Sequence, residues 1–323
     1  MGDPLELSIV ICTYNRAELV AEALESLLPQ GWEDVPCEVV VVDNNSTDNT
    51  RAAVARFQGR LPALRYVLEP QRGLSHARNR GWKEARGRYV GYLDDDARAS
   101  RNWIRTAARI ARGRGPDAFG GPYYAFYKSP TPYWWKDSYR SVEHASTARN
   151  LLAGEYVSGG NMFVRRDRLE ALGGFDAAFG MARGRLAYGE ETVLIQRLRE
   201  RFAGATVYYD PELSIQHLVR KERMKLRVLA RDRLARGRDT FKARKDPAPN
   251  RPSRLRVWAR IGRAMGGVVT DVLRGTFRRD RSRYPFLPNY LYEHTGEKLM
   301  RLGALLELDR KLRSHGHSER GSP

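Results

Sequence analysis

Short apolar runs alternate with amphipathic segments over residues 1–100. The runs are rich in aliphatic and β-branched residues and have the length of strands buried on both faces. We expect strands at 7–11, 38–42, 64–68 and 89–93. Apolar residues recur at helical spacing between them, so we expect helices at 17–28, up to about 57, and at 74–85. This βαβαβαβ rhythm predicts an α/β fold with a mainly parallel sheet and helices on both faces.

Polar clusters follow these strands at the points where they end. The clusters are Thr13-Tyr14-Asn15, Asp43-Asn44, Gln71-Arg72-Gly73 and Asp94-Asp95-Asp96. Open α/β sheets bind ligands at the carboxyl ends of their strands, so the four clusters together predict one binding site at that edge. The alternative is that loops after strands are polar in any protein. That alternative accounts less well for the acidic residues.

The triplet Asp94-Asp95-Asp96 suggests a bound cation. Three like charges repel one another unless a cation neutralises them. Mg²⁺ and Mn²⁺ prefer oxygen ligands and are often held by one or two carboxylates plus substrate phosphates. The triplet therefore predicts a metal that bridges the protein to a diphosphate. The alternative is a solvated acidic turn before a helix that starts near Ser100.

Residues 120–145 are rich in aromatic side chains and proline, with Trp134 and Trp135 adjacent. Aromatic faces stack on sugar rings, so this segment is a candidate acceptor platform. The alternative, which the sequence leaves equally open, is a segment that covers the core.

Two further pairs of residues, one of glycines and one of glutamates, are candidates for the site. Gly159-Gly160 interrupts a strand-like run, and such a pair allows the backbone to approach a ligand closely. Residues 180–189 contain three glycines and predict a loop. Glu190-Glu191 then opens an amphipathic helix that continues to about 202.

Positive charge is concentrated at the C-terminal end. The net charge is +19, and residues 220–323 carry 28 Lys and Arg against 11 Asp and Glu, or +17 of that total. This break predicts a nearly neutral, catalytic-looking domain at 1–219 and a separate basic region at 220–323. The basic region 220–323 suggests an anionic partner, which could be nucleic acid, lipid headgroups or a phosphorylated acceptor.

The segment 254–278 has the pattern of a basic amphipathic helix. Its apolar side holds Leu255, Trp258, Ile261, Met265, Val268, Val269, Val272 and Leu273, and its opposite side holds Arg256, Arg260, Arg263 and Arg274. This pattern, with the basic and aromatic residues that follow, predicts attachment to a membrane surface through 254–290. The alternative is that the apolar side packs on the catalytic domain.

The sequence also bears on the compartment. No apolar run reaches the length of a transmembrane helix, and the acidic N-terminus lacks the apolar region of a signal peptide. We interpret Cys12 and Cys37 as reduced core residues. The expected location is cytoplasmic, with peripheral attachment to the inner face of the membrane as an option.

Seven motifs occur in one order over roughly residues 5–220. They are SIVICTYNR at 8–16, VVDNNSTD at 41–48, RGLSHARNRG at 72–81, YLDDD at 92–96, GGNM at 159–162, GGFD at 173–176 and GEE at 189–191. In this order and approximate spacing they resemble the inverting nucleotide-sugar glycosyltransferases of glycosyltransferase family 2. The resemblance implies a GT-A (Rossmann-like) fold, a mixed, mainly parallel sheet flanked by helices, to which this chain adds a basic α-helical extension at 220–323. It also implies that the catalytic domain 1–219 has a nucleotide-binding half at about 1–100 and an acceptor-side half at about 101–219.

The resemblance also implies roles for individual residues. Contacts to the nucleotide sugar would come from Thr13, Tyr14, Asn15, Arg16, Asp43, Asn44, Arg72, Arg78, Asp94 and Asp95. Asp43 would bind the base, typically uracil, so the expected donor is a UDP-sugar. Mn²⁺ or Mg²⁺ would be bound by Asp96, Asp94 and His217, with Asp96 the more direct ligand of the two aspartates. Trp134, Trp135, Gly160 and Asn161 would lie on the side of a sugar or lipid-linked acceptor.

Glu191 lies where the family usually has an aspartate as catalytic base. Glutamate is one methylene longer, and Glu190 remains a rival for the role. Either carboxylate could deprotonate the acceptor hydroxyl, while cations stabilise the departing diphosphate. The alternative is that two glutamates simply favour the N-terminus of a helix.

Other functions fit the sequence less well. A nucleic-acid-binding protein would explain the basic region, but no recognised binding motif is present. A nucleotidyltransferase would need a Gly-rich basic loop after the first strand, and a Rossmann dehydrogenase would need Gly-x-Gly-x-x-Gly there. The chain has Thr13-Tyr14-Asn15-Arg16 instead. A non-catalytic relative that binds sugar nucleotides also remains open.

Overall fold

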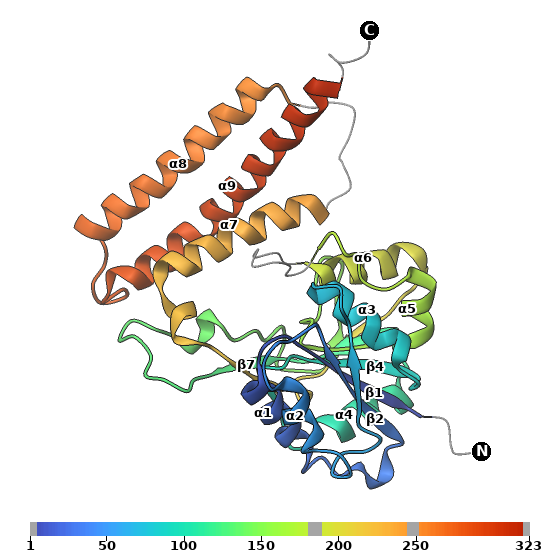
Figure 1. Ribbon diagram of the computed structural model, residues 1–323. Helices are drawn as coiled ribbons and strands as arrows, with labels where there is room; N and C mark the ends of the chain where they lie inside the picture. The colour runs from blue at the N-terminus through green and yellow to red at the C-terminus, as the bar shows by residue number, and fades with distance from the viewer. Residues whose placement is uncertain (1–4, 180–188, 244–251, 319–323) are drawn as a thin grey trace. The chain divides into compact units, whose positions relative to one another are not determined.

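An eight-stranded sheet forms the centre of the first of two units (Figure 1). The structure is a computed structural model, and it describes residues 5–179, 189–243 and 252–318. The strand order is β3-β2-β1-β4-β9-β6-β10-β8. In that order the strands are β3 (Arg65–Leu68), β2 (Cys37–Asp43), β1 (Leu7–Thr13), β4 (Tyr89–Leu93), β9 (Asn161–Arg165), β6 (Ala118–Gly120), β10 (Val207–Tyr209) and β8 (Arg149–Asn150).

The first four strands in the sheet are parallel to one another. β1 pairs with β2 from Leu7 opposite Cys37 to Thr13 opposite Asp43, so these two strands end side by side. β1 also pairs in parallel with β4, and β2 with β3. β9 then enters antiparallel between β4 and β6. The predicted mixed, mainly parallel sheet is confirmed, and the four expected strands lie within two residues of their predicted bounds.

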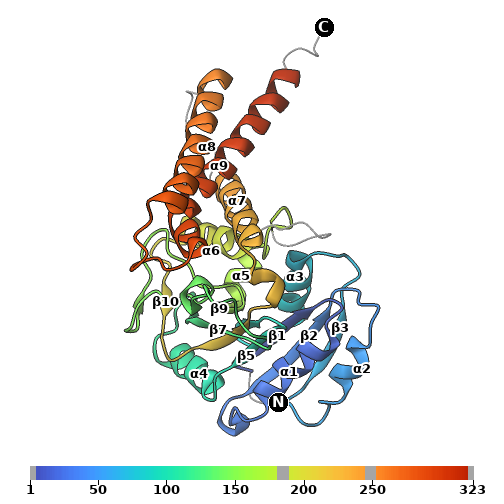
Figure 2. The same ribbon diagram turned by 90° about the vertical axis from the view of Figure 1, so that its left-hand side faces the viewer.

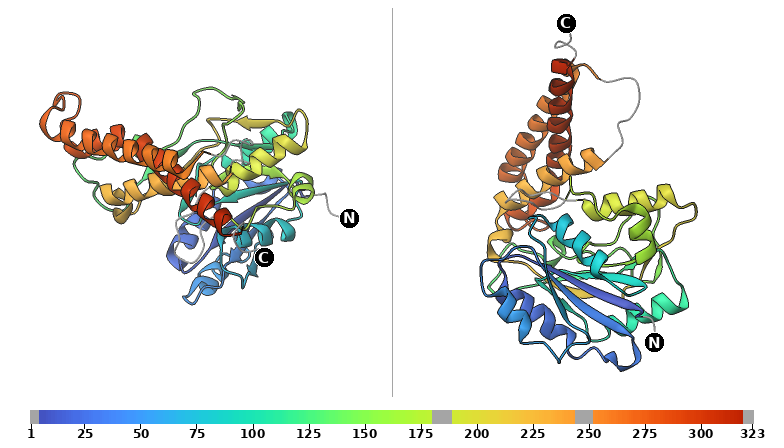
Figure 3. Two further views of the ribbon diagram at one scale, coloured as in Figure 1. Left: turned by 90° about the horizontal axis from the view of Figure 1, so that it is seen from above. Right: turned by 45° about the vertical axis from the view of Figure 1, so that its right-hand side comes forward.

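Helices cover both faces of this sheet because neighbouring strand residues point in opposite directions. Ile9 and Ile11 of β1 face the core formed with α1 (Ala17–Leu27), α2 (Thr50–Ala55) and α4 (Trp103–Gly113). Val10 faces the core formed with α3 (Leu74–Glu84), α5 (Arg166–Leu172) and α6 (Glu190–Arg201). Figure 1 shows these two helical layers on either side of the sheet, and the right-hand view of Figure 3 shows the parallel strands in blue between them.

A second, three-stranded sheet brings distant segments of the first unit together. Its order is β5 (Ala97–Ala99), β11 (Ile215–Leu218) and β7 (Tyr123–Phe126). His217 lies within β11, opposite Ala97, and the Leu218 amide donates to the Asp96 carbonyl oxygen at 2.9 Å. The pairing with β5 therefore holds His217 inside β11.

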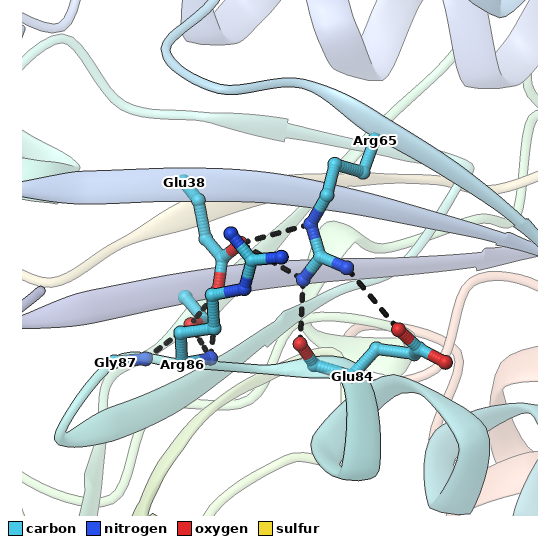
Figure 4. A network of polar contacts seen from close by, with 6 residues as sticks. Glu38, Arg65, Glu84, Arg86 and Gly87 are labelled. Atoms are coloured by element: carbon cyan, nitrogen blue, oxygen red, sulfur yellow. Dashed lines mark hydrogen bonds and ion pairs between the residues drawn. The ribbon is translucent and has the colours of Figure 1, made fainter.

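Glu38 organises a polar network at the other end of the strands (Figure 4). Its side chain is fully buried on β2, in a run that reads as purely apolar around it. Its carboxylate accepts hydrogen bonds from the Ser8 hydroxyl at 2.7 Å, the Arg86 amide at 2.7 Å and the Arg65 guanidinium at 2.9 Å. The network therefore joins β1, β2 and β3 to the segment after α3.

The second unit is helical and contains α7 (Leu226–Ala243), α8 (Arg254–Phe277) and α9 (Leu287–Ser318), preceded by the short η3 (Lys221–Met224). α9 packs against both α7 and α8, and Figure 2 shows the three helices grouped together. Small residues let α7 and α9 approach closely: a Cβ on Gly303 would lie 2.1 Å from the Leu234 carbonyl oxygen.

Several acidic side chains of this unit are buried and paired with basic ones. Five carboxylates are buried among the helices, and each has a basic partner. They are Asp232, Asp239, Asp271, Glu307 and Asp309. The acidic side chains are thus used inside the bundle, and the excess arginines remain on its surface.

The division of the chain into units refines the predicted domains. The first unit includes residues 5–128, 137–179 and 190–219, and the second begins at Arg220, where the sequence changes in charge. The segment 129–136 belongs with the second unit, which no sequence signal indicates. None of the helices within the described ranges is long and apolar enough to cross a membrane. Both cysteines are free thiols.

Candidate active site

The four polar clusters meet at the carboxyl ends of β1, β2, β3 and β4, as the sequence predicts. The Asn15 side-chain oxygen accepts from the Thr47 amide at 2.7 Å, which joins the end of β1 to the loop after β2. Arg16 donates to Asp95 at 2.6 Å, which joins the same loop to the end of β4. Asn15 has a φ of 50°, a left-handed conformation that Asn tolerates better than most residues.

Asp43 and Asn44 have different parts in this arrangement. Asp43 is buried, and its carboxylate accepts from the Ser46 amide at 2.8 Å and from the Tyr66 hydroxyl. The Asn44 side chain donates to the Glu69 and Gln71 carbonyl oxygens and accepts from the Gly73 amide. We expected Asn44 to contact the nucleotide. Its amide already shapes the loop after β3, and the nucleotide contact stays a prediction.

Asp94, Asp96 and His217 form the cluster whose geometry suits a metal ion. One ligand atom from each residue can be chosen so that all three lie within 4.8 Å of one another. His217 Nε2 is 3.2 Å from an Asp96 oxygen and 3.5 Å from an Asp94 oxygen. Carboxylate oxygens and an imidazole nitrogen suit Mn²⁺ or another first-row divalent ion, and the half-buried side chains leave room for a substrate oxygen. The donor set therefore fits the expected metal.

Basic side chains neutralise the triplet in this structure. Arg16 lies 2.6 Å from Asp95 and 3.2 Å from Asp96. Burial raises the pKa of Asp95 above its usual value of 3.8, and Arg16 only partly opposes this effect. Burial also works to lower the pKa of His217, but the carboxylates of Asp96 and Asp94 outweigh it, so the pKa of His217 is raised. The same carboxylates that favour the charged form of His217 would also favour a bound cation.

Arg78 connects this cluster to the start of α6. Its guanidinium is almost wholly buried and lies 2.6 Å from Glu190 and 3.4 Å from Asp94. Glu190 and Asp94 outweigh the effect of burial and raise the pKa of Arg78. We expected Arg78 near the nucleotide or the diphosphate. In the structure it forms an internal ion pair that positions the start of α6, and its place near the diphosphate stays a prediction.

The glycine pair Gly159-Gly160 lies next to Arg78 and Asp94. A Cβ on Gly159 would lie 2.7 Å from an Arg78 nitrogen, and one on Gly160 would lie 2.1 Å from an Asp94 oxygen. Gly160 was expected on the acceptor side, and the structure places it next to Asp94. The two glycines leave the space that the charged groups occupy.

Asn161 and Trp134, two further residues expected on the acceptor side, are both buried. Asn161 is fully buried, with its side-chain oxygen bonded to Trp103 Nε1 at 2.8 Å and its nitrogen bonded to two carbonyl oxygens, so it is a core residue. Trp134 belongs to the second unit, where it is 8% exposed and its carbonyl oxygen accepts from Asn289. Trp135 packs edge-on against it and is half-buried.

Glu190 and Glu191 differ in their surroundings. Both are in the first turn of α6. Glu190 is 6% exposed and neutralised by Arg78, whereas Glu191 is half-buried. The geometry thus favours Glu191 as the carboxylate that can reach a substrate.

The nucleotide end of the site is more open. The Arg72 guanidinium stacks 4.6 Å from the centre of the Tyr14 ring, and both side chains are exposed. A depression of about 490 Å³ lies beside them, lined by Asn45, Pro70, Gln71, Arg72 and His76. Thr13 is buried at the end of β1, next in the sheet to Asp43.

Sequence reasoning missed two features of the site. Cys12 lies among Arg78, Asp94 and Asp95, and burial raises the pKa of its thiol to about 12, so it stays protonated. Cys12 directly precedes Thr13, a predicted site residue, and this position could have indicated that Cys12 lies close to the site. Ser75 of α3 donates to the Phe179 carbonyl oxygen at 2.7 Å and holds the chain on the approach to α6. Only the fold reveals that contact.

Comparisons with known proteins agree with this geometry. The model of Glycosyl transferase family 2 matches residues 8–173. The succinoglycan biosynthesis protein ExoM of Rhizobium meliloti is 32% identical over 73% of this chain and 74% of its own length. Glucosyl-dolichyl phosphate glucuronosyltransferase of Haloferax volcanii is 27% identical over 66% of this chain and 69% of its own.

A solved structure shares the fold. The mannosyltransferase PcManGT from Pyrobaculum calidifontis, in complex with GDP-Man and Mn²⁺, matches with a TM-score of 0.55 and 19% identity. The match covers 97% of this chain and 79% of that one.

The fold and its site define a glycosyltransferase enzyme with the GT-A architecture. The family match extends over half of the chain, and the relative from Rhizobium meliloti covers most of it. The chain belongs to glycosyl transferase family 2.

Proposed function

We propose that this protein is a metal-dependent, inverting glycosyltransferase that moves a sugar from a nucleoside-diphosphate sugar to an acceptor hydroxyl. The observation that carries the proposal is the cluster of Asp94, Asp96 and His217 at the strand ends, with Glu191 on the adjoining helix. The cluster offers a cation site for the diphosphate, and Glu191 offers a carboxylate for the acceptor.

Asp94, Asp96 and His217 would hold a divalent ion. When bound, the ion would offset the negative charge that develops on the departing diphosphate. Arg16 and Arg78 hold the two carboxylates in place, since Arg16 contacts Asp96 and Arg78 contacts Asp94. The Mn²⁺ in the mannosyltransferase structure supports a divalent metal in this fold.

The donor nucleotide would occupy the open end of the site. Asp43 sits at the end of β2, where the family resemblance implies a base contact, and this supports a UDP-sugar. Tyr14 and Arg72 are the exposed groups beside the depression, and an aromatic ring paired with a guanidinium can stack on a base or bind a phosphate.

Glu191 would act as the general base. The acceptor oxygen attacks the anomeric carbon while the bond from that carbon to the diphosphate oxygen breaks. Glu191 takes the acceptor's proton, and the nucleoside diphosphate leaves with the bonding electron pair. Because attack and departure occur on opposite sides in one step, the configuration at the anomeric carbon inverts. Glu190 does not take this role, because Arg78 holds it.

The acceptor is proposed to be a sugar, free or linked to a lipid. The name of the Haloferax volcanii relative, glucosyl-dolichyl phosphate glucuronosyltransferase, refers to a sugar on a lipid phosphate, which supports the lipid-linked option. A cytoplasmic location at the inner face of a membrane would be consistent with such an acceptor, and it stays a prediction.

The test measures nucleoside-diphosphate release from UDP-, GDP- and dTDP-sugars, with Mg²⁺, with Mn²⁺ and with EDTA. We expect release from one donor, dependent on metal and lost in Glu191→Gln while donor binding by calorimetry persists. Glu200→Gln is a matched control, because Glu200 is an exposed glutamate near the other end of α6. It should turn over like the wild type.

The negative outcomes are also informative. Donor binding without release would indicate a missing acceptor or a non-catalytic protein, and addition of polyprenyl-phosphate-linked sugars would separate the two. No binding of any donor by the wild-type protein would contradict the proposal.

A further inference from the structure

We infer that the exposed apolar side of α8 attaches the protein to the surface of a lipid bilayer with anionic headgroups. Six side chains form this stripe: Leu255, Trp258, Met265, Val269, Leu273 and Phe277. Each is between 47% and 81% exposed, and their spacing places them along one side of the helix. The inference concerns the second unit and does not depend on which sugar the first unit transfers.

The structure separates this stripe from the side of α8 that packs on α9. Val257 and Ile261 are buried, and Asp271 pairs with Lys298 of α9. A Cβ on Gly275 would lie 2.5 Å from the Tyr290 ring, so the helices are in close contact there. The sequence assigns Ile261 to the same apolar side as Met265, but the fold uses only Ile261 in the bundle. Of the six stripe residues, Trp258 also contacts α9, because the Arg313 guanidinium lies 6.0 Å from the centre of its ring.

The charge around the stripe suits an anionic surface. Arg256, Arg260, Arg263 and Arg274 are exposed on the side of α8 away from the stripe. The one acidic residue of α8, Asp271, is buried against Lys298, so the exposed sides of the helix are free of negative charge. Arginine side chains are long enough to reach lipid phosphates while the stripe enters the boundary between headgroups and acyl chains.

Geometry also favours a helix that lies in the surface plane. α8 has 24 residues and is about 36 Å long at 1.5 Å per residue. The stripe runs from Leu255 to Phe277, almost the full helix, and its polar opposite side excludes a helix surrounded by lipid. A flat bilayer surface can bury such a stripe along its whole length.

Other binding partners for this side of α8 explain fewer of these observations. A nucleic acid would pair with the arginines but leave the apolar stripe in water. Two copies meeting through the stripe would place two units of net charge +17 against each other. A membrane surface satisfies both the apolar stripe and the arginines.

The test is co-sedimentation of the full-length protein with phosphatidylglycerol vesicles and with phosphatidylcholine vesicles. We expect stronger binding to phosphatidylglycerol, weakened by salt. Val269→Glu with Leu273→Glu should lower vesicle affinity by roughly tenfold or more, because two apolar contacts are lost and two negative charges are added. Arg263→Gln with Arg274→Gln is matched in net charge and leaves the stripe intact. It should bind more weakly than wild type, with a smaller salt dependence, but more tightly than the stripe variant.

Donor binding by calorimetry should be equal in the wild type, the stripe variant and the arginine variant. A loss of vesicle binding can therefore be told apart from a loss of the proposed transferase function. No binding of wild type to phosphatidylglycerol vesicles overturns the inference, as does wild-type affinity in the stripe variant. A wild-type dimer without lipid that the stripe substitutions dissociate, seen by sedimentation velocity, would overturn it in favour of an interface between two copies.

Discussion

Arg78 and Glu190 form an ion pair 2.6 Å long in the interior of the first unit, although 112 residues separate them in the chain. The same guanidinium lies 3.4 Å from Asp94. One arginine thus connects the acidic triplet to the first turn of α6. Because Glu191 follows Glu190 directly, this pair also fixes where the proposed base can stand relative to the metal cluster.

The two neighbouring glutamates should therefore respond differently to substitution. Glu190→Gln removes the nearer counter-ion of the buried Arg78 and leaves only Asp94 at 3.4 Å, and we expect a loss of about 3 kcal/mol in the free energy of unfolding. Glu191→Gln should change that free energy by less than about 1 kcal/mol and should lower kcat roughly 10²- to 10⁴-fold. Urea unfolding and donor turnover measure the two effects. A Glu190→Gln variant that kept wild-type stability but lost turnover would reverse the roles.

Gly160 should control metal affinity. A methyl group there would lie 2.1 Å from an Asp94 oxygen, so Gly160→Ala must displace that carboxylate from His217 and Asp96. We expect the concentration of Mn²⁺ needed for half-maximal turnover to rise about tenfold, in line with the effect of displacing groups around a metal site. The control is Gly113→Ala at the end of α4, where an added methyl group meets no atom within 4 Å. Equal metal dependence in both variants would contradict the prediction.

The sequence predicts the first unit well because its signals are local. Apolar runs such as 38–42 can only be buried, and parallel strands necessarily bring their carboxyl ends to one edge. The convergence of Asn15, Asp43 and Asp95 follows from that rule. Neither the run nor the rule depends on contacts between distant side chains.

The roles of individual polar residues were harder to predict, because they depend on partners far away in the chain. Asn161 and Arg78 belong to motifs that suggest a ligand contact, yet Trp103 and Glu190 take up their polar groups. A motif shows that a side chain matters at its position. It does not show whether the side chain faces the substrate or the supporting layer behind it.

The carboxyl group of Asp117 should make stability depend on pH. Burial alone would raise its pKa, but hydrogen bonds from Arg168 Nε at 2.7 Å and the Thr206 amide at 2.8 Å outweigh this, so the pKa lies below 3.8. A lowered pKa in the folded state gives stability that is present above the unfolded value. That stability is lost as pH falls through the folded value.

The matching experiment compares wild type with Asp117→Asn by urea unfolding. We expect the variant to be less stable by about 1–2 kcal/mol near pH 6, and the difference to shrink below about pH 4 as wild-type Asp117 becomes protonated. The comparison removes the contribution of every other carboxylate, because both proteins share them. A difference that stayed constant from about pH 6 to about pH 3 would show that the charge of Asp117 contributes nothing.

Two helical glycines in the second unit should have opposite effects when replaced by alanine. A methyl group on Gly303 of α9 would lie 2.1 Å from the Leu234 carbonyl oxygen of α7, and backbone cannot move aside cheaply, so Gly303→Ala should destabilise the unit by about 1–3 kcal/mol. Gly262 lies within α8, where a methyl group meets no atom within 4 Å. There the same substitution removes only backbone freedom from the unfolded chain, and we expect a gain of about 0.5–1 kcal/mol. The readout is the urea midpoint of the helical circular dichroism signal. The two variants separate helix propensity from helix packing, because propensity alone would make both of them more stable.

A Gly303→Ala protein that is more stable than the wild type would show that α7 and α9 are not in close contact.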